Sequence, residues 1–202
     1  MRDVLQAQHH QLREIEGYVQ AVMPRLPYHN FNHVMEATAV AYTLATAYSL
    51  SANERFSLGA AMRLHDVIYV PGRDNNEELS AGDANRLLRL LGVDDKTIDE
   101  TLGIILATKP TNKPQTLLQM LGRDADMHNL GTPYFFLSGE RFRAEFSPIT
   151  DDAWYKKTLA NIGDFEFYTK PGKMLYTETW NNNREQLRKK ISECNQQLAK
   201  RN

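Results

Sequence analysis

The chain has 202 residues, which suits one domain with a substantial core, and its 24 basic residues nearly balance its 25 acidic residues. This balance argues against bulk attraction to nucleic acid or to anionic membranes. The single cysteine, Cys194, excludes an internal disulfide framework and a cysteine-rich zinc site. Because no secretory leader follows Met1 and no run of about 18 apolar residues exists, we expect a soluble cytoplasmic protein.

Apolar residues recur at helical spacing through almost the whole chain. They predict an N-terminal helix over 3–23 and a second helix over 33–49. Residues 51–54 have the form of a capping box, so a third helix begins there and should run through His65 and Asp66 to about Tyr69. The same periodicity, with its glycine and proline stops, predicts further helices over 76–91, 95–108, 115–129, 133–146, 151–169 and 177–200.

No segment shows the alternating pattern of a β-strand, and none resembles an inter-domain linker. Internal repeats and low-complexity tracts are also missing from the sequence. The predicted fold class is therefore all-α, with one compact helical domain over residues 1–202.

The pair His65-Asp66 lies in the largely apolar run 60–69. An ionised carboxylate in such surroundings is costly unless it is paired or bound to a metal. His33 lies upstream, and Asp124 and Asp126 lie downstream. Taken singly, each of these residues is explained by helix capping, a turn or a satisfied core position. Together, two imidazoles and two carboxylates can hold a first-row divalent metal and leave positions open for water and substrate.

The order of these residues resembles the signature of the HD superfamily of metal-dependent phosphohydrolases, which is a histidine, a His-Asp pair and a distant aspartate. The resemblance is to a small bacterial family of predicted metal-dependent HD phosphohydrolases, and it implies a helical HD-type core over about 28–176, flanked by helices 3–23 and 177–200. It rests on the series Tyr28-His29 and His33, His65-Asp66-Val67-Ile68-Tyr69, Asn76-Glu77-Glu78-Leu79-Ser80-Ala81, Asp124-Ala125-Asp126 and Arg143-Ala144-Glu145-Phe146.

The resemblance implies one divalent metal ion held by His33, His65, Asp66 and Asp126. Asp126 is chosen because the ligand in other HD proteins is the aspartate of an Ala-Asp pair. Asp124 would then support a ligand or cap a helix. Imidazole and carboxylate ligands suit Mn, Fe, Co, Ni or Zn better than Mg.

Catalytic and substrate-binding roles fall on five residues. Asp66 belongs to the reacting centre, and Glu77 is the candidate to orient or deprotonate the attacking water, although acids also favour helix N-termini. Arg143 is the candidate phosphate ligand through paired N–H donors, with an ordinary ion pair as the alternative. His29 is expected to be a pocket residue other than a metal ligand, and Lys109 a phosphate contact or a charge at a helix end.

These features predict a metal-dependent phosphohydrolase that acts on a nucleotide or another small phosphate ester through a metal-activated water. The alternative is a catalytically inactive metal- or nucleotide-binding HD module, which the non-acidic residues Tyr69, Val70 and Asn75 keep open. Redox chemistry at an iron pair is a third hypothesis, and the absence of a histidine between His65 and His128 argues against it. The predicted partner is a small phosphorylated, nucleotide-like substrate, with no membrane and no strong nucleic-acid signal.

Overall fold

Nine α-helices and one short 3₁₀ helix, η1, make up the secondary structure of residues 2–199, which are the residues that this computed structural model describes. No strand lies among them, so the all-α prediction is confirmed. The elements are α1 Arg2–Val22, α2 Phe31–Ala45, α3 Ala52–Leu64, α4 Asn76–Leu90, α5 Asp95–Ala107, α6 Leu117–Asp126, η1 Met127–Gly131, α7 Phe135–Arg143, α8 Asp151–Ile162 and α9 Lys170–Ala199.

Helix α3 is the centre of the main hydrophobic core, where it packs against α1, α2, α5 and α6. Every residue from Phe56 to Met62 is buried, as expected of a helix that other helices surround. The capping box predicted at its start is present, since Ser51 accepts from the backbone of Glu54 and Glu54 accepts from the backbone of Ser51. Because α3 is packed on all sides, its end fixes the position of His65 and Asp66, which follow it directly.

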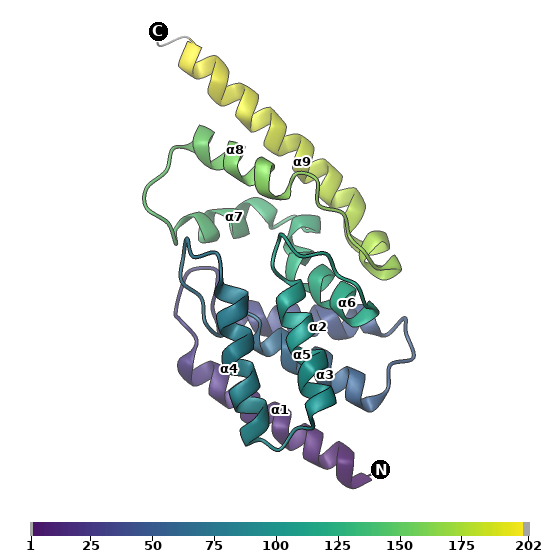
Figure 1. Cartoon of the computed structure of the whole chain (residues 1–202). Coiled ribbons are helices and arrows are strands. Elements are labelled where there is room, and N and C mark those ends of the chain that lie inside the picture. The colour runs from purple at the N-terminus through teal and green to yellow at the C-terminus, as the bar shows by residue number, and fades with distance from the viewer. Residues whose placement is uncertain (1, 200–202) are drawn as a thin grey trace.

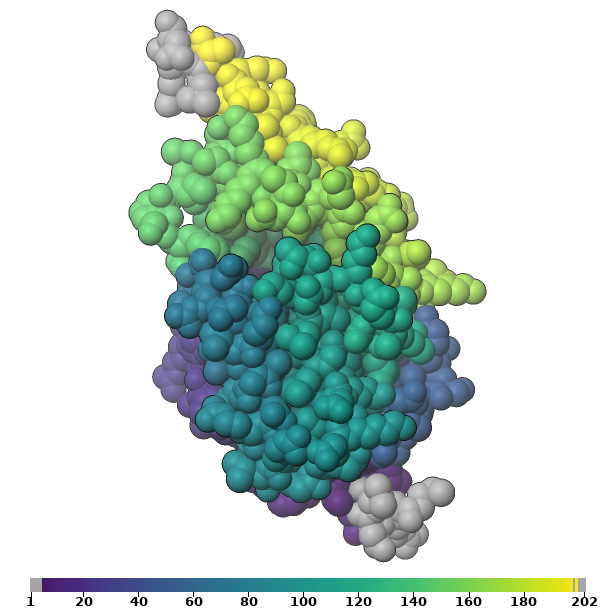
Figure 2. All heavy atoms as spheres, viewed as in Figure 1, coloured from purple at the N-terminus to yellow at the C-terminus, as the bar shows by residue number. Residues whose placement is uncertain are grey.

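A second, smaller cluster of apolar side chains joins η1, α7, α8 and α9. Trp180 is its largest member and donates its indole N–H to the carbonyl of Phe165 at 2.9 Å. In Figure 1, α7, α8 and α9 lie together at one end of the bundle and α1 lies at the other. Figure 2 shows the last part of α9 extending beyond the body of the molecule.

The third predicted helix ends earlier than expected, at Leu64 instead of Tyr69, and His65 is its C-cap. The following segment leaves the helix because its backbone finds side-chain partners in α4. The hydroxyl of Ser80 accepts from the N–H of Ile68 and donates to its carbonyl, and the amide of Asn76 pairs in the same way with Val70. Apolar periodicity carries no signal for such side-chain partners of the backbone.

Two boundaries near the C-terminus were also predicted wrongly. Helix α8 ends at Ile162, and α9 begins at Lys170 instead of 177. Pro171 and Gly172 in the first turn of α9 obscured its start, although proline is tolerated there. The hydroxyl of Thr169 accepts from the N–H of Gly172 and so caps this first turn.

None of the described helices combines the length and the apolarity needed to cross a membrane.

Candidate metal centre

Four side chains from three separate segments meet at one buried point. His33 lies in the first turn of α2, His65 and Asp66 follow α3, and Asp126 is the last residue of α6. Each offers one ligand atom, and these atoms all lie within 4.8 Å of one another. This cluster, here called the His-Asp cluster, is the set of residues that the sequence predicted as metal ligands, and it could hold a metal ion.

The distances within the His-Asp cluster suit ligands of a common ion. The Nε2 atoms of His33 and His65 lie 3.2–3.4 Å from Oδ2 of Asp66 and from Oδ1 of Asp126. Neither Nε2 atom has a hydrogen-bond partner, although both are buried. First-row ions bind such atoms at about 2.0–2.2 Å, which places neighbouring ligands roughly 3 to 3.5 Å apart. A shared metal therefore accounts for two nitrogen atoms that would otherwise be unsatisfied.

The tautomer of His65 is set by the helix that it terminates. Its Nδ1 lies 2.9 Å from the carbonyl oxygen of Met62, which can only accept a hydrogen bond. Nδ1 therefore carries a proton, and the neutral ring turns the lone pair of Nε2 toward Asp66 and Asp126. His33 reaches the cluster because α2 starts at the N-cap Asn30, whose side chain accepts from the backbone of Asn32 and His33.

The opposite charges in the cluster govern the protonation of its members. Burial by itself lowers the pKa of His33, but the carboxylates of Asp126 and Asp66 outweigh it and raise the pKa to about 8. Burial also lowers the pKa of His65, but the charges of Asp66 and Asp126 outweigh it and raise this pKa well above its usual value. In return, and against the effect of burial, the imidazoles hold the pKa of both carboxyls below the usual range. A metal ion that binds at the cluster would therefore displace protons from it.

Asp124 does not take part in the His-Asp cluster. Its carboxylate is fully buried and accepts hydrogen bonds from the N–H of Tyr168, the N–H of Thr169 and the hydroxyl of Thr169, at 2.6–2.8 Å. It therefore anchors the start of α9 to α6, which agrees with the capping role considered for it. Burial raises the pKa of Asp124, and the three hydrogen bonds oppose this.

Glu77 lies in the first turn of α4, and Lys109 follows the end of α5. Burial raises the pKa of the half-buried Glu77, and the charges of Asp66 and Asp126 raise it further. Nζ of Lys109 lies 2.6 Å from Oε1 of Glu78 in an ion pair. The charges of the cluster carboxylates therefore act on Glu77. Lys109 has the neighbouring carboxylate of Glu78 as its ion-pair partner.

Arg143 is not brought to the His-Asp cluster. Its Nη1 lies 2.7 Å from Oδ1 of Asp151 and 3.5 Å from Oε2 of Glu140, and its Nη2 donates to the carbonyl of Ile149. These contacts lie at the corner between α7 and α8. They correspond to the ion-pair alternative, and they do not support the expected phosphate contact.

His29 lies beside the cluster, as expected of a pocket residue. Its Nε2 is 3.9 Å from Oδ2 of Asp66, and its ring is stacked on Tyr69 with centroids 3.4 Å apart. On the other side, Nδ1 lies 2.7 Å from Oε2 of Glu145. Sequence reasoning named the Arg143-Ala144-Glu145-Phe146 series but took the arginine as its functional member. Helical periodicity offers no signal for a contact between residues 116 positions apart.

Tyr28, which was named in the sequence series without a role, forms a further wall of the site. Its ring lies 4.7 Å from that of His33, and its hydroxyl accepts from the side-chain amide of Asn129 at 3.2 Å. Burial raises the pKa of the Tyr28 phenol, and the charge of Asp126 raises it further. The phenol therefore stays neutral beside the carboxylates.

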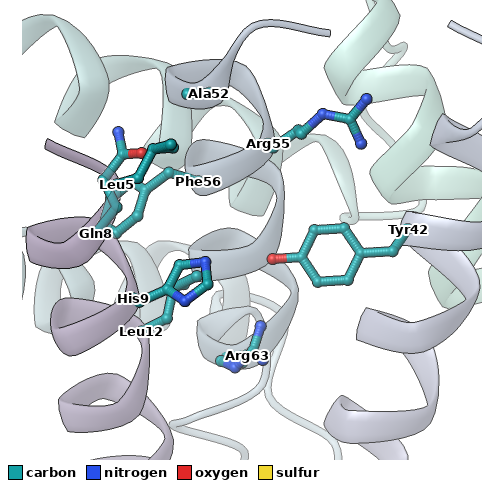
Figure 3. A pocket seen from close by; sticks show the side chains of 9 residues that line it. All are labelled: Leu5, Gln8, His9, Leu12, Tyr42, Ala52, Arg55, Phe56 and Arg63. Atoms are coloured by element: carbon teal, nitrogen blue, oxygen red, sulfur yellow. The ribbon is translucent and has the colours of Figure 1, made fainter. Parts of the chain in front are cut away.

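A pocket of about 560 Å³ lies elsewhere, between α1, α2 and α3. Figure 3 shows the Tyr42 hydroxyl and the His9 ring directed into it, with Arg55 and Arg63 at its border. No member of the His-Asp cluster lines it. We assign the candidate chemistry to the cluster, because among residues 2–199 only there do buried nitrogen atoms lacking hydrogen-bond partners face two carboxylates.

Comparison with known proteins establishes the fold alone. No family model matches the chain, and no curated protein matches it. The chain is similar to the crystal structure of Bacillus subtilis YpgQ in complex with ADP, with a TM-score of 0.67 and 19% sequence identity. The similarity covers 93% of this chain and 96% of that chain, so nearly the whole helical arrangement is shared.

Proposed function

We propose that this protein is a metal-dependent phosphohydrolase that acts on a nucleotide or another small phosphate ester. The observation that carries the proposal is the His-Asp cluster, with the two buried Nε2 atoms of His33 and His65 directed at two carboxylates. The order of its residues resembles the HD superfamily signature. The similarity in fold to YpgQ, which was crystallised with ADP, supports a nucleotide as the ligand class.

The four cluster residues would hold one divalent ion such as Mn²⁺, Fe²⁺, Co²⁺, Ni²⁺ or Zn²⁺. When bound, such an ion lowers the pKa of water and polarises a phosphoryl oxygen. His33, His65 and Asp66 are buried and Asp126 is half-buried. All four lie at or next to helix ends, which hold the side chains in place before an ion binds.

Glu77 is the candidate proton acceptor for the attacking water. Burial raises the pKa of its carboxyl and so brings it closer to the working pH than that of an ordinary glutamate. Lys109 is the candidate phosphate contact, since its ammonium pairs with Glu78, the sequence neighbour of Glu77, whereas Arg143 makes its contacts at the corner between α7 and α8. A phosphate oxygen would compete with Glu78 for this ammonium.

The test is a panel of nucleotides and simple phosphate esters, offered to metal-stripped protein reloaded with each candidate ion. Products are followed by phosphorus NMR, which detects cleavage of any phosphate bond. We expect turnover with at least one ion and its loss in Asp66→Ala. Nucleotide binding by calorimetry without turnover under any ion would instead establish the alternative, a catalytically inactive binding module.

A further inference from the structure

Glu145 is a buried carboxylate that serves the segment before α2 from a distant part of the chain. It follows α7, and its side chain is fully shielded from solvent. Its Oε1 accepts from the backbone N–H groups of Tyr28 and His29, each at 2.7 Å. Its Oε2 lies 2.7 Å from Nδ1 of the His29 ring. Both oxygens are therefore occupied, each by a different kind of donor.

The different donors to the two oxygens of Glu145 determine which ring nitrogen of His29 carries the proton. Because Glu145 is engaged as an acceptor by two backbone donors, its second oxygen also accepts, and Nδ1 of His29 is the donor. In the neutral ring Nε2 then carries only a lone pair. Nε2 faces Oδ2 of Asp66 at 3.9 Å, which is too long for a direct hydrogen bond.

The ring has little freedom to leave this position. Tyr69 stacks on one face at 3.4 Å with an angle of 13° between the planes. The rings of Tyr28 and Phe142 approach edge-on, with centroids at 4.9 Å and 5.2 Å. The imidazole is therefore held by aromatic contacts and by one carboxylate, and its Nε2 is directed at the His-Asp cluster.

We propose that Glu145 is a positioning residue that acts through His29. By fixing the Nδ1–H tautomer, it presents the Nε2 lone pair to the reacting centre, where Nε2 accepts a hydrogen bond from the attacking water and orients it. The effect on turnover rests on the proposed phosphohydrolase function, whereas the tautomer of His29 does not. This role belongs to the glutamate of the Arg143-Ala144-Glu145-Phe146 series, and Arg143 holds the adjoining helix corner.

The variant Glu145→Gln tests the tautomer directly. The two backbone N–H groups need an acceptor, so the amide oxygen remains opposite them and the amide nitrogen faces Nδ1 of His29. An amide nitrogen donates, so the variant should invert the ring to the Nε2–H tautomer while keeping the backbone contacts. Glu140→Gln is the matched control, because Glu140 lies exposed on the preceding helix α7.

The measurement is a long-range proton–nitrogen spectrum of metal-free protein with labelled histidine, recorded where raising the pH further moves no signal. The His29 signals are assigned by their disappearance in His29→Asn. We expect the Nδ1–H tautomer in the wild type and in Glu140→Gln, and the Nε2–H tautomer in Glu145→Gln. An Nε2–H tautomer in the wild type would overturn the proposal without recourse to any variant.

Turnover supplies the second readout. With metal content unchanged, Glu145→Gln should lower kcat on the order of 10- to 100-fold, the size expected for a lost hydrogen bond in the transition state, with KM little changed. His29→Asn should lose as much, and the double variant no more than either alone. Inversion of the tautomer with wild-type kcat would show that the tautomer set by Glu145 plays no part in turnover, and would overturn the positioning role in catalysis. If the wild type turns over nothing, the proposed function fails, and an Nδ1–H ring that inverts in Glu145→Gln still establishes the positioning of His29.

Discussion

Asp124 and Asp126 are separated by one alanine in α6, yet their carboxylates serve different parts of the molecule. Asp126 lies 3.3–3.4 Å from the imidazole nitrogens of His33 and His65, whereas Asp124 accepts three hydrogen bonds at the start of α9. Residues two apart on a helix point in very different directions, which permits this separation. One helix therefore completes the candidate metal centre and also anchors the C-terminal helix.

This separation predicts different consequences for the two aspartates. Asp124→Asn should lower the free energy of unfolding by about 1–3 kcal/mol, because a buried amide cannot accept all three hydrogen bonds. Metal stoichiometry should stay at one ion per chain. Asp126→Asn should show the opposite pattern, with weaker metal binding and smaller destabilisation. Denaturant unfolding and elemental analysis of both variants check this, and metal loss in Asp124→Asn alone would reverse the assignment.

The His-Asp cluster should bind about one divalent ion per chain. His65→Ala should weaken binding more than about a hundredfold, since it removes one of four ligands from a preformed site. His10→Ala is the matched control, because His10 is exposed on α1 and far from the cluster in sequence. Calorimetric titration of the metal-stripped proteins gives both affinities. Equal affinities in the two variants would refute the assignment of the site.

Metal affinity should increase with pH through the neutral range to at least about pH 8. The pKa of His33 is raised to about 8 in the metal-free protein, so the ion must displace a proton from this ring at neutral pH. Below this pKa, each unit of pH should cost up to about a tenfold loss of apparent affinity for each displaced proton. Titrations in two buffers of different ionisation enthalpy measure the protons released. An affinity that is independent of pH between 6 and 8 would contradict this account.

Arg143→Ala should change stability slightly and catalysis not at all. The guanidinium pairs with the exposed Asp151 and donates to the carbonyl of Ile149, so its loss should cost about 1 kcal/mol or less. The values of kcat/KM and metal content should match those of the wild type. A tenfold drop in kcat/KM in a normally folded variant would contradict this and show that Arg143 contributes to substrate binding or turnover.

Much of the site was predictable from residue types and their order. His33, His65, Asp66 and Asp126 were expected together, and the structure gathers them. Glu145 could not be found in this way, because its contact with His29 joins residues 116 positions apart and leaves no periodic trace. The stacking of Tyr69 on His29 could not be found in this way either, and in the sequence Tyr69 stood out only as a tyrosine where some HD enzymes have an acidic residue.

By itself, the sequence determined the helical class of the fold and most helix positions, because apolar periodicity and local capping are properties of neighbouring residues. The members of the cluster were expected from the order of their residue types and from the resemblance to the HD superfamily. The tertiary structure decided which member of each motif faces the cluster. It turned Asp126 inward and Asp124 toward α9, and it tied Arg143 to Asp151. It also ended α3 at Leu64, because the side chains of Ser80 and Asn76 take up the backbone polar groups that follow. Such side-chain partners for the backbone are chosen by the packing of α3 against α4, and only the folded chain brings them together.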